Sequence, residues 1–251
     1  MADELTIVRI YPELLGTYGD RGNGLALVHR AEARGIAARV IDVSADDPLP
    51  RSGDIYLLGG GEDSSQLLAA RSLMADDQAH RVLATAPCLA VCAGLQLMAQ
   101  SFYGADGRPQ PGLGLIDVTS GRLAERAVGE VVTEPDELPG IGTLTGFENH
   151  RGGAVLGPDA RPLGRLLAGV GNGDDRYEGA VQGATIATYL HGPVLVRNPG
   201  LADLLLERAV GHELAPYVDP AVDQLRAERL DAADPRRRES RSWRSRLRRA
   251  G

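Results

Sequence analysis

Short apolar runs alternate with longer helical stretches up to about residue 112 of the chain. Runs near residues 5–11, 38–43, 54–58 and 88–91 are apolar enough for strands that are covered on both faces. The stretches that follow the Gly-rich segment 18–24 up to about residue 34, at 64–84 and from 93 onward fit helices packed against such strands. Four strand–loop–helix units in a row predict an α/β fold with a mostly parallel, doubly wound sheet and helices on both of its faces.

The pattern changes after about residue 112 to shorter strands and turns. Strands are expected near residues 114–119, 129–133, 143–148, 154–156 and 179–182, followed by a buried strand over 185–190 and a final helix that ends near residue 210. We therefore assign residues 1–212 to one domain. Residues 213–251 are expected to form an Arg-rich, disordered tail, because the stretch from Asp234 onward is poor in apolar residues.

Composition narrows the classes of function. The chain has 251 residues, 43% of them hydrophobic, which is enough for the core of one large domain. All 27 basic residues are Arg, so neither a Schiff-base lysine nor the lysine of a Walker phosphate loop is available. Residues 226–251 hold ten Arg against four acidic residues, which leaves the main body strongly acidic and does not favour nucleic-acid binding.

The same composition bears on location. The sequence shows no secretory segment and no stretch close to the ~20 apolar residues of a membrane span. Two cysteines give no disulfide framework, so a cytoplasmic location is expected. In the tail, Trp243 and Leu247 are four residues apart among arginines, which would suit a helix on the inner face of a membrane. A solvated tail without a function is the favoured interpretation.

Cys92 is the candidate nucleophile. It follows the apolar run Leu89-Ala-Val91 and precedes the small residues Ala93 and Gly94, a pattern typical of a strand that turns sharply into a helix. A helix N-terminus favours the reactive thiolate of a cysteine placed there. Cys88, inside the predicted strand, fits a buried structural cysteine instead. Four strand residues span roughly 13 Å, too far for a disulfide between the two.

The loops that follow the predicted strands should converge on one crevice, because ligands bind at the carboxyl ends of the strands in such sheets. These loops are residues 18–24, 59–63, 92–94 and 191–193. Gly59-Gly60-Gly61 permits backbone N–H groups to turn toward Cys92 and, with the N–H of Ala93, to form an oxyanion hole. A plain tight turn is the competing interpretation, and the pattern predicts no metal site.

A thiolate nucleophile needs an acid and base partner, usually a histidine. His191 directly follows the strand over 185–190 and is the chosen candidate. His150, in the polar segment Phe147-Glu-Asn-His-Arg-Gly-Gly153, is interpreted as a hydrogen-bonded structural histidine. His29, His80 and His212 are expected at the surface.

Five motifs in this order resemble those of class I glutamine amidotransferases of the CobB/CobQ type, and among these the GatD family, the glutaminase subunits of lipid II isoglutaminyl synthase. They lie between residues 5 and about 211, and they are Tyr18-Gly-Asp-Arg-Gly-Asn23, Leu58-Gly-Gly-Gly-Glu-Asp63, Val91-Cys-Ala-Gly94, Gly146-Phe-Glu-Asn-His-Arg-Gly152 and Tyr189-Leu-His-Gly192. The resemblance implies that Cys92 attacks the side-chain amide of L-glutamine and that Gly60 and Ala93 hold the oxyanion. It also implies that His191 is the general acid and base and that Arg126 binds the substrate.

The resemblance further implies a partner. The chain has no Walker motif and needs no cofactor of its own, so ATP and Mg²⁺ are expected on a MurT-like Mur ligase subunit in a heterodimer. That subunit would use the ammonia to amidate the α-carboxyl of D-Glu in lipid II, giving D-isoglutamine. Three alternatives stay open: a CobB/CobQ-type subunit of another pathway, a non-catalytic binding module of the same fold, and a cysteine peptidase-like hydrolase.

One residue departs from the wider class. Many triad amidotransferases have a Glu two residues after the histidine, where this chain has Pro193. Glu148, Asp20 and Asp63 are candidates within the chain for the acid that orients the imidazole. Our hypothesis at this level is that a partner protein supplies the acid instead.

Overall fold

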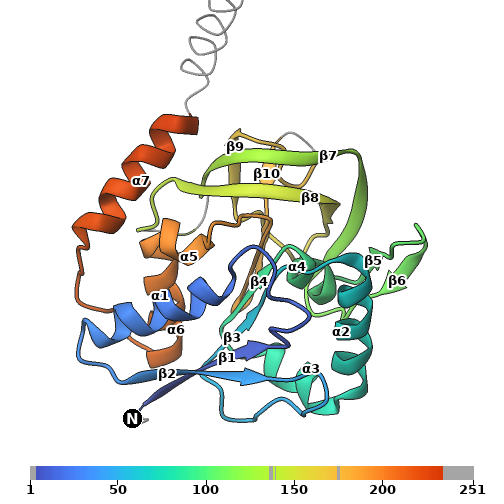
Figure 1. The fold of residues 1–251 in the computed structure, drawn as a ribbon, viewed down its shortest axis with the longest axis horizontal. Helices are drawn as coiled ribbons and strands as arrows, with labels where there is room; N and C mark the ends of the chain where they lie inside the picture. Colours follow the sequence, from blue (N-terminus) through green and yellow to red (C-terminus); the bar gives the residue numbers. More distant parts are fainter. Residues whose placement is uncertain (1–3, 136–137, 139, 174–175, 234–251) are drawn as a thin grey trace, which may run out of the picture.

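Two β-sheets and the helices around them form the protein in the computed structural model, which describes residues 4–135, 138, 140–173 and 176–233 (Figure 1). The first sheet has the strand order β11-β12-β4-β3-β1-β2 and is parallel except for β11. Its strands are β1 (Leu5–Ile10), β2 (Ala38–Val43), β3 (Ile55–Leu58), β4 (Cys88–Val91), β11 (Ala180–Gln182) and β12 (Thr185–Thr188). The predicted α/β fold with a mostly parallel sheet is therefore confirmed.

Helices cover both faces of this sheet, with α1, α5 and α6 on one side and α2, α3 and α4 on the other (Figure 1). Their bounds are α1 (Arg21–Glu32), α2 (Asp63–Ala75), α3 (Asp77–Leu83), α4 (Ala93–Met98), α5 (Val194–Arg197), α6 (Pro199–Val210) and α7 (Pro220–Ala233). No helix in the described part of the chain is both long enough and apolar enough to cross a membrane.

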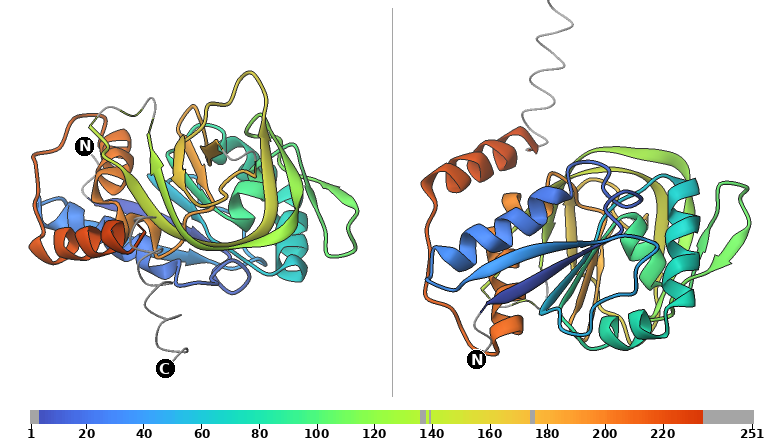
Figure 2. Two further views of the ribbon diagram at one scale, coloured as in Figure 1. Left: turned by 90° about the horizontal axis from the view of Figure 1, so that it is seen from above. Right: turned by 60° about the horizontal axis from the view of Figure 1, so that its bottom comes forward.

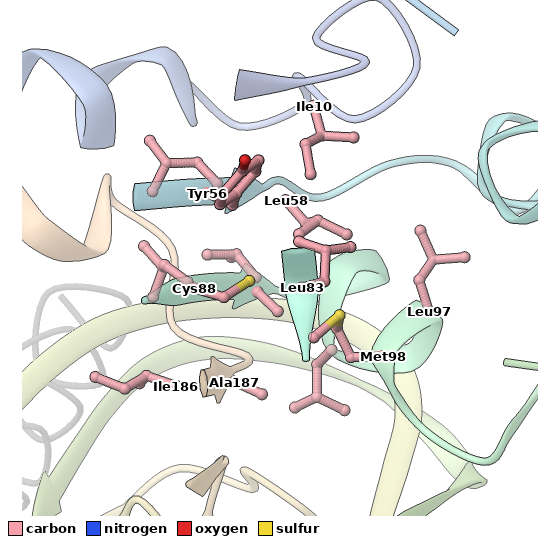
Figure 3. Packing of buried hydrophobic residues seen from close by; sticks show 14 of the residues in the cluster. Ile10, Tyr56, Leu58, Leu83, Cys88, Leu97, Met98, Ile186 and Ala187 are labelled. Atoms are coloured by element: carbon pink, nitrogen blue, oxygen red, sulfur yellow. The ribbon is translucent and has the colours of Figure 1, made fainter. Parts of the chain in front are cut away.

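Figure 3 shows the core between the first sheet and the helices on one side of it. Leu97 and Met98 of α4 and Leu83 of α3 are almost completely buried there, on the face of the sheet that Leu58 also occupies. Strands β3, β4 and β12 are buried along their whole length, which explains why their sequences read as continuous apolar runs.

The second sheet was not anticipated as a separate unit. Its strands are β5 (Ser101–Tyr103), β6 (Pro109–Pro111), β7 (Val118–Glu134), β8 (Leu144–Leu156), β9 (Gly164–Ala168) and β10 (Tyr177–Glu178). The strand expected near residues 129–133 is instead part of the 17-residue β7, whereas only the last two residues of the strand expected near 114–119 belong to β7. The strands expected near 143–148 and 154–156 are parts of the 13-residue β8. Figure 2 shows the two long strands curving together along one side of the molecule.

Two other expectations were wrong. The helix predicted over residues 64–84 is two helices, because Asp76 is extended and its side chain accepts a hydrogen bond from the N–H of Gln78 at 2.8 Å, which starts α3. The expected disordered tail includes α7, which contacts α5, β7 and β8. The chain before α7 is held to α1, where the Arg34 side chain donates to the carbonyl of Ala215 at 2.6 Å. The part of the tail from residue 234 lies outside the described residues.

Candidate active site

Cys92 occupies a sharp turn between β4 and α4. Its φ of 54° and ψ of −102° form a conformation that residues other than glycine rarely adopt. The N–H of Cys92 donates to the carbonyl of Thr188 at 2.8 Å, and the N–H of Gly94 donates to the carbonyl of Gly59 at 3.2 Å. A Cβ at Gly94 would lie only 2.7 Å from the carbonyl oxygen of Leu58, so the turn requires glycine there. This is the strand–turn–helix elbow that the sequence predicts.

The two cysteines have different surroundings. Cys88 is completely buried in β4, and burial raises the pKa of its thiol to about 12, which keeps it protonated and unreactive. Cys92 is 8% exposed and lines a pocket with polar walls. Only Cys92 is therefore placed to react with a ligand.

His191 lies beside Cys92 across Gly60. A Cβ at Gly60 would lie 2.9 Å from Cε1 of His191 and 3.6 Å from Cβ of Cys92, so glycine lets the two side chains come close together. The backbone of His191 is fixed by β8, because its N–H donates to the carbonyl of Phe147 and its carbonyl accepts from the N–H of Phe147, both at 2.9 Å. The structure thus brings together the predicted nucleophile and the predicted acid and base.

The ring of His191 is buried but strongly influenced by charge. Burial alone would lower its pKa, but the Asp20 carboxylate and the Cys92 sulfur outweigh burial and raise the pKa of His191 to about 9. Nδ1 of His191 is 3.9 Å from Oδ1 of Asp20, beyond hydrogen-bond distance, and neither ring nitrogen has a hydrogen-bond partner among the described residues. The ring of Tyr18 lies against the imidazole, with 4.8 Å between ring centres.

Asp20 also contacts the glycine-rich loop. Its Oδ2 accepts a hydrogen bond of 2.6 Å from the N–H of Gly60, the group assigned to the oxyanion hole. Ala93, the other assigned donor, is the first residue of α4, and a residue there has no acceptor for its N–H within the helix. Gly60 can therefore hold an oxyanion only after its N–H leaves Asp20.

A pocket of about 250 Å³ opens beside Cys92. It is lined by side chains or backbone of Tyr18, Gly61, Glu62, Asp63, Gln66, Cys92, Ala93, Gln96, Tyr103, Gly104, Gly121, Arg122, Arg126, Asn149, His150, Arg151 and Gly152. The volume suits a ligand the size of a free amino acid, and both charge signs occur on the walls. Three of the four loops expected to converge contribute to the pocket, and His191 of the fourth adjoins Cys92.

Arg126 reaches this pocket from an irregularity in β7. Between the pairs Arg122–Gly152 and Ala127–His150, β7 has four residues and β8 has only one. Such a bulge turns side chains away from the regular alternation of the strand. Nε of Arg126 donates to Oδ1 of Asn149 at 2.6 Å. The guanidinium is thus held at the pocket wall, where its positive charge is complementary to that of a carboxylate ligand.

The remaining candidate residues have other contacts. His150 is buried and hydrogen-bonded, with its Nδ1 2.7 Å from the carbonyl of Gly152 and its ring stacked on Tyr189, as its interpretation as a structural histidine requires. Glu148 accepts hydrogen bonds of 2.9 Å from the N–H groups of Val170 and Gly171, which leaves it occupied away from His191. Asp63 begins α2 at the pocket wall. His29, His80 and His212 are exposed, as expected.

Several pocket residues were not singled out from the sequence, and four of them lie in or near the quoted motifs. The hydroxyl of Tyr18 accepts a hydrogen bond from Asn149 Nδ2 at 3.0 Å and covers one side of the pocket. Gln66 donates to Gln96 at 2.7 Å in the buried wall. The motif spacing marked these segments, but only the folded chain shows which side chains point inward.

Comparison with known proteins agrees with this geometry. Residues 6–199 match the CobB/CobQ-like glutamine amidotransferase domain. The chain is 34% identical over 224 residues to the GatD subunit of the glutamine-hydrolysing lipid II isoglutaminyl synthase of Staphylococcus aureus, covering 88% of this chain and 90% of that relative. It is 32% identical over 233 residues to the corresponding GatD subunit of Streptococcus pneumoniae, covering 90% and 89%. A cobyric acid synthase of Sphingopyxis alaskensis is 30% identical over 74% of this chain but only 39% of that relative.

Solved structures support the fold. A crystal structure of a glutamine amidotransferase aligns with a TM-score of 0.54 and 22% identity over 81% of this chain and 98% of that one. A glutamine amidotransferase from Thermotoga maritima aligns with a TM-score of 0.50 and 15% identity over 82% of each chain. The chain therefore belongs to the CobB/CobQ-like glutamine amidotransferase family, and within it to the GatD group.

Proposed function

We propose that this chain is the glutaminase subunit of a lipid II isoglutaminyl synthase. It would hydrolyse L-glutamine to L-glutamate and ammonia and pass the ammonia to an ATP-dependent, Mur ligase-like partner. The observation that carries the proposal is the strained Cys92 elbow, which lies next to the buried His191 at the edge of a pocket of amino-acid size. The similarity to GatD subunits over about nine-tenths of the chain supports the pathway.

The chemistry follows from the positions of the side chains. The Cys92 thiolate attacks the side-chain amide carbon of glutamine, and the oxyanion that forms accepts hydrogen bonds from the N–H of Ala93 and, once it is released by Asp20, from that of Gly60. Collapse of this intermediate breaks the C–N bond, and His191 gives its proton to the leaving nitrogen, so that ammonia departs and a thioester remains. Neutral His191 then takes a proton from water, whose oxygen attacks the thioester and releases glutamate and the Cys92 thiolate.

The pocket walls favour free glutamine over a peptide. Arg126 would bind the α-carboxylate through its guanidinium, and Glu62 and Asp63, which also line the pocket, would bind the α-ammonium group. For the orienting acid we propose Asp20, which supplies the carboxylate next to His191 that Pro193 does not. An acid from the partner remains the competing proposal.

The partner would supply the rest of the synthase reaction. We expect it to bind ATP and Mg²⁺, to activate the α-carboxyl of D-Glu in the lipid II stem peptide, and to form D-isoglutamine from the ammonia. The heterodimer would then act at the inner face of the membrane, where the lipid-linked substrate is held.

The test is a reconstitution with matched cysteine variants. The chain is purified with its co-expressed ATP-dependent partner and given [amide-¹⁵N]glutamine, ATP and lipid II. Wild type and Cys88→Ala should release glutamate and place ¹⁵N in the stem peptide. Cys92→Ala should do neither, with a loss of at least about 10³-fold. Glutaminase activity that persists in Cys92→Ala would refute the nucleophile. Activity without label in lipid II would assign the enzyme to another pathway, such as that of cobyric acid.

A further inference from the structure

Glu178 is a fully buried carboxyl that the proposed chemistry does not use. It belongs to β10 in the second sheet, yet its side chain binds the end of β12 in the first sheet. Its two oxygens accept from the hydroxyl of Thr188 at 2.9 and 3.1 Å. Oε1 also accepts a short hydrogen bond of 2.6 Å from the N–H of Tyr189. One carboxyl therefore joins the two sheets just before His191.

The backbone of this segment needs such an acceptor. Strand β12 pairs with β4 up to Thr188, opposite Val91, and β4 then turns away at Cys92. The next N–H groups of the segment have lost their partner strand while still buried, and an unpaired buried N–H costs about 1–3 kcal/mol. Glu178 satisfies Tyr189, and the Thr188 hydroxyl that Glu178 holds in place accepts from the N–H of Leu190 at 3.0 Å.

The same segment contacts both reacting groups. The carbonyl of Thr188 accepts the hydrogen bond from the N–H of Cys92, so the anchored residue also holds the elbow. His191 comes three residues after Thr188, and its ring has no hydrogen-bond partner among the described residues. The position of the imidazole therefore depends on its backbone, which Phe147 holds on one side and the Glu178 network holds on the other.

Charge adds to this anchoring. Burial raises the pKa of Glu178 to about 7, and the negative charge of Glu148 on β8 adds to this increase. The hydrogen bonds from Tyr189 and Thr188 and the nearby His191 act in the opposite direction, but they do not outweigh burial. The interaction of two charges is mutual, so an ionised Glu178 favours the protonated form of His191, as Asp20 and the Cys92 thiolate also do. This contribution is present above pH 7 and fades as Glu178 becomes protonated below it.

We propose that Glu178 is a positioning residue of the glutaminase site: its carboxylate anchors the end of β12, fixes the imidazole of His191 relative to Cys92, and favours the imidazolium form. The inference rests on the proposed role of His191 as acid and base. It concerns a residue from the second sheet that lies outside the pocket and does not contact the substrate.

The test compares Glu178→Gln with Thr188→Val in the complex with the partner. Glu178→Gln keeps the shape and removes the charge, whereas Thr188→Val keeps the charge and removes the bridging hydroxyl. Glu134→Gln, at an exposed carboxylate of β7 that pairs with Arg165, is the matched control. The measurements are kcat and KM for glutamine, the thermal midpoint, and the NMR titration of ¹³C-labelled His191, assigned with a His191→Gln variant.

For Glu178→Gln we expect kcat to fall about tenfold with an unchanged KM, and the His191 titration to move to lower pH by about half a pH unit. Thr188→Val should lower kcat to a similar degree with a smaller movement of the titration, and Glu134→Gln should change nothing. The inference is overturned if Glu178→Gln lowers only the thermal midpoint while kcat and the His191 titration stay at wild-type values. The titration needs no glutaminase activity, so it decides this inference even if the wild-type complex hydrolyses no glutamine and the proposed function fails.

Discussion

Asp20 contacts two parts of the site at once, with one carboxylate oxygen for each. Oδ2 accepts the N–H of Gly60 at 2.6 Å and holds the glycine turn, whereas Oδ1 faces Nδ1 of His191 at 3.9 Å and has no hydrogen-bond partner among the described residues. An unpaired buried carboxylate oxygen is costly unless a nearby cation compensates it. The imidazolium form of His191 is that cation, so the two groups stabilise each other's charge.

Replacing Asp20 should therefore change the pH dependence of the reaction more than the fold. The pKa of His191 is about 9, so the imidazolium that protonates the leaving ammonia persists at neutral pH and is lost as the pH rises through 9. In Asp20→Asn the alkaline limb of kcat/KM should move down by about one to two pH units. The free energy of unfolding should depend on pH in the same direction. The Asp20–His191 pair contributes its whole stabilisation below pH 6.5, and this stabilisation is lost as the pH rises through 9.

The measurement is the pH profile of kcat/KM for the complex, with Glu134→Gln as the control, since Glu134 is an exposed carboxylate that pairs with Arg165. An alkaline limb that stays in place in Asp20→Asn would show that the orienting acid comes from elsewhere, and the partner subunit would then be its source.

At the scale of elements, the bulge in β7 separates the two arginines that this strand places at the pocket. Arg122 lies in regular register opposite Gly152, while Arg126 is the last of the four residues of the bulge and is held by Asn149. Both line the pocket.

We expect Arg126→Ala to raise KM for glutamine about 30- to 100-fold and to change kcat little, because a charge-assisted bond to the α-carboxylate is made in the ground state and in the transition state alike. Steady-state glutaminase kinetics of Arg126→Ala and Arg122→Ala provide the comparison. If the increase in KM occurs in Arg122→Ala instead, the substrate carboxylate binds on the regular part of the strand and our assignment of Arg126 is wrong.

These elements also show how far the sequence was informative. Strands β3, β4 and β12 were predicted because strands buried on both faces are continuous apolar runs, and β1 and β2 were also predicted from their apolar residues. The elbow at Cys92 followed from small residues after such a run. Strands β7 and β8 were read as fragments, because glycines and exposed polar residues within them look locally like turns. The continuous pairing of β7 with β8 joins residues that are far apart in the sequence, so the local pattern could not show it. The function of Arg126 came only from the family resemblance, and Glu178 gave no local signal.

At the scale of the whole molecule, the active site lies where the two sheets meet. Cys92 follows the first sheet and Arg126 comes from the second, and His191 follows β12 while pairing with Phe147 of β8. Contacts that hold the sheets together therefore also hold the site together. Helix α7 is one such contact, since it packs on β7, β8 and α5 at the edge of both units (Figure 1).

Arg226 is the residue of α7 through which this contact should act. Its guanidinium donates to the carbonyl of Thr143 just before β8, and Nη1 lies 3.3 Å from Oδ1 of Asn198 and 3.4 Å from the carbonyl of Arg197. Asn198 in turn is fully buried and accepts from the N–H of Thr145 at 2.8 Å. Arg226 thus joins α7 to β8 and to the junction of α5 and α6.

Arg226→Ala should lower the free energy of unfolding by about 1–2 kcal/mol, since it leaves partly buried carbonyls without donors. Arg229→Ala, at an exposed position of the same helix, removes the same charge and should cost less than about 0.5 kcal/mol. Urea denaturation measures both, and hydrogen exchange should show loss of amide protection in α7 for Arg226→Ala alone. Equal destabilisation by the two variants would mean that the loss of a positive charge, and not the loss of the Arg226 hydrogen bonds, destabilises the protein. Helix α7 would then not belong to the structural unit that supports the site.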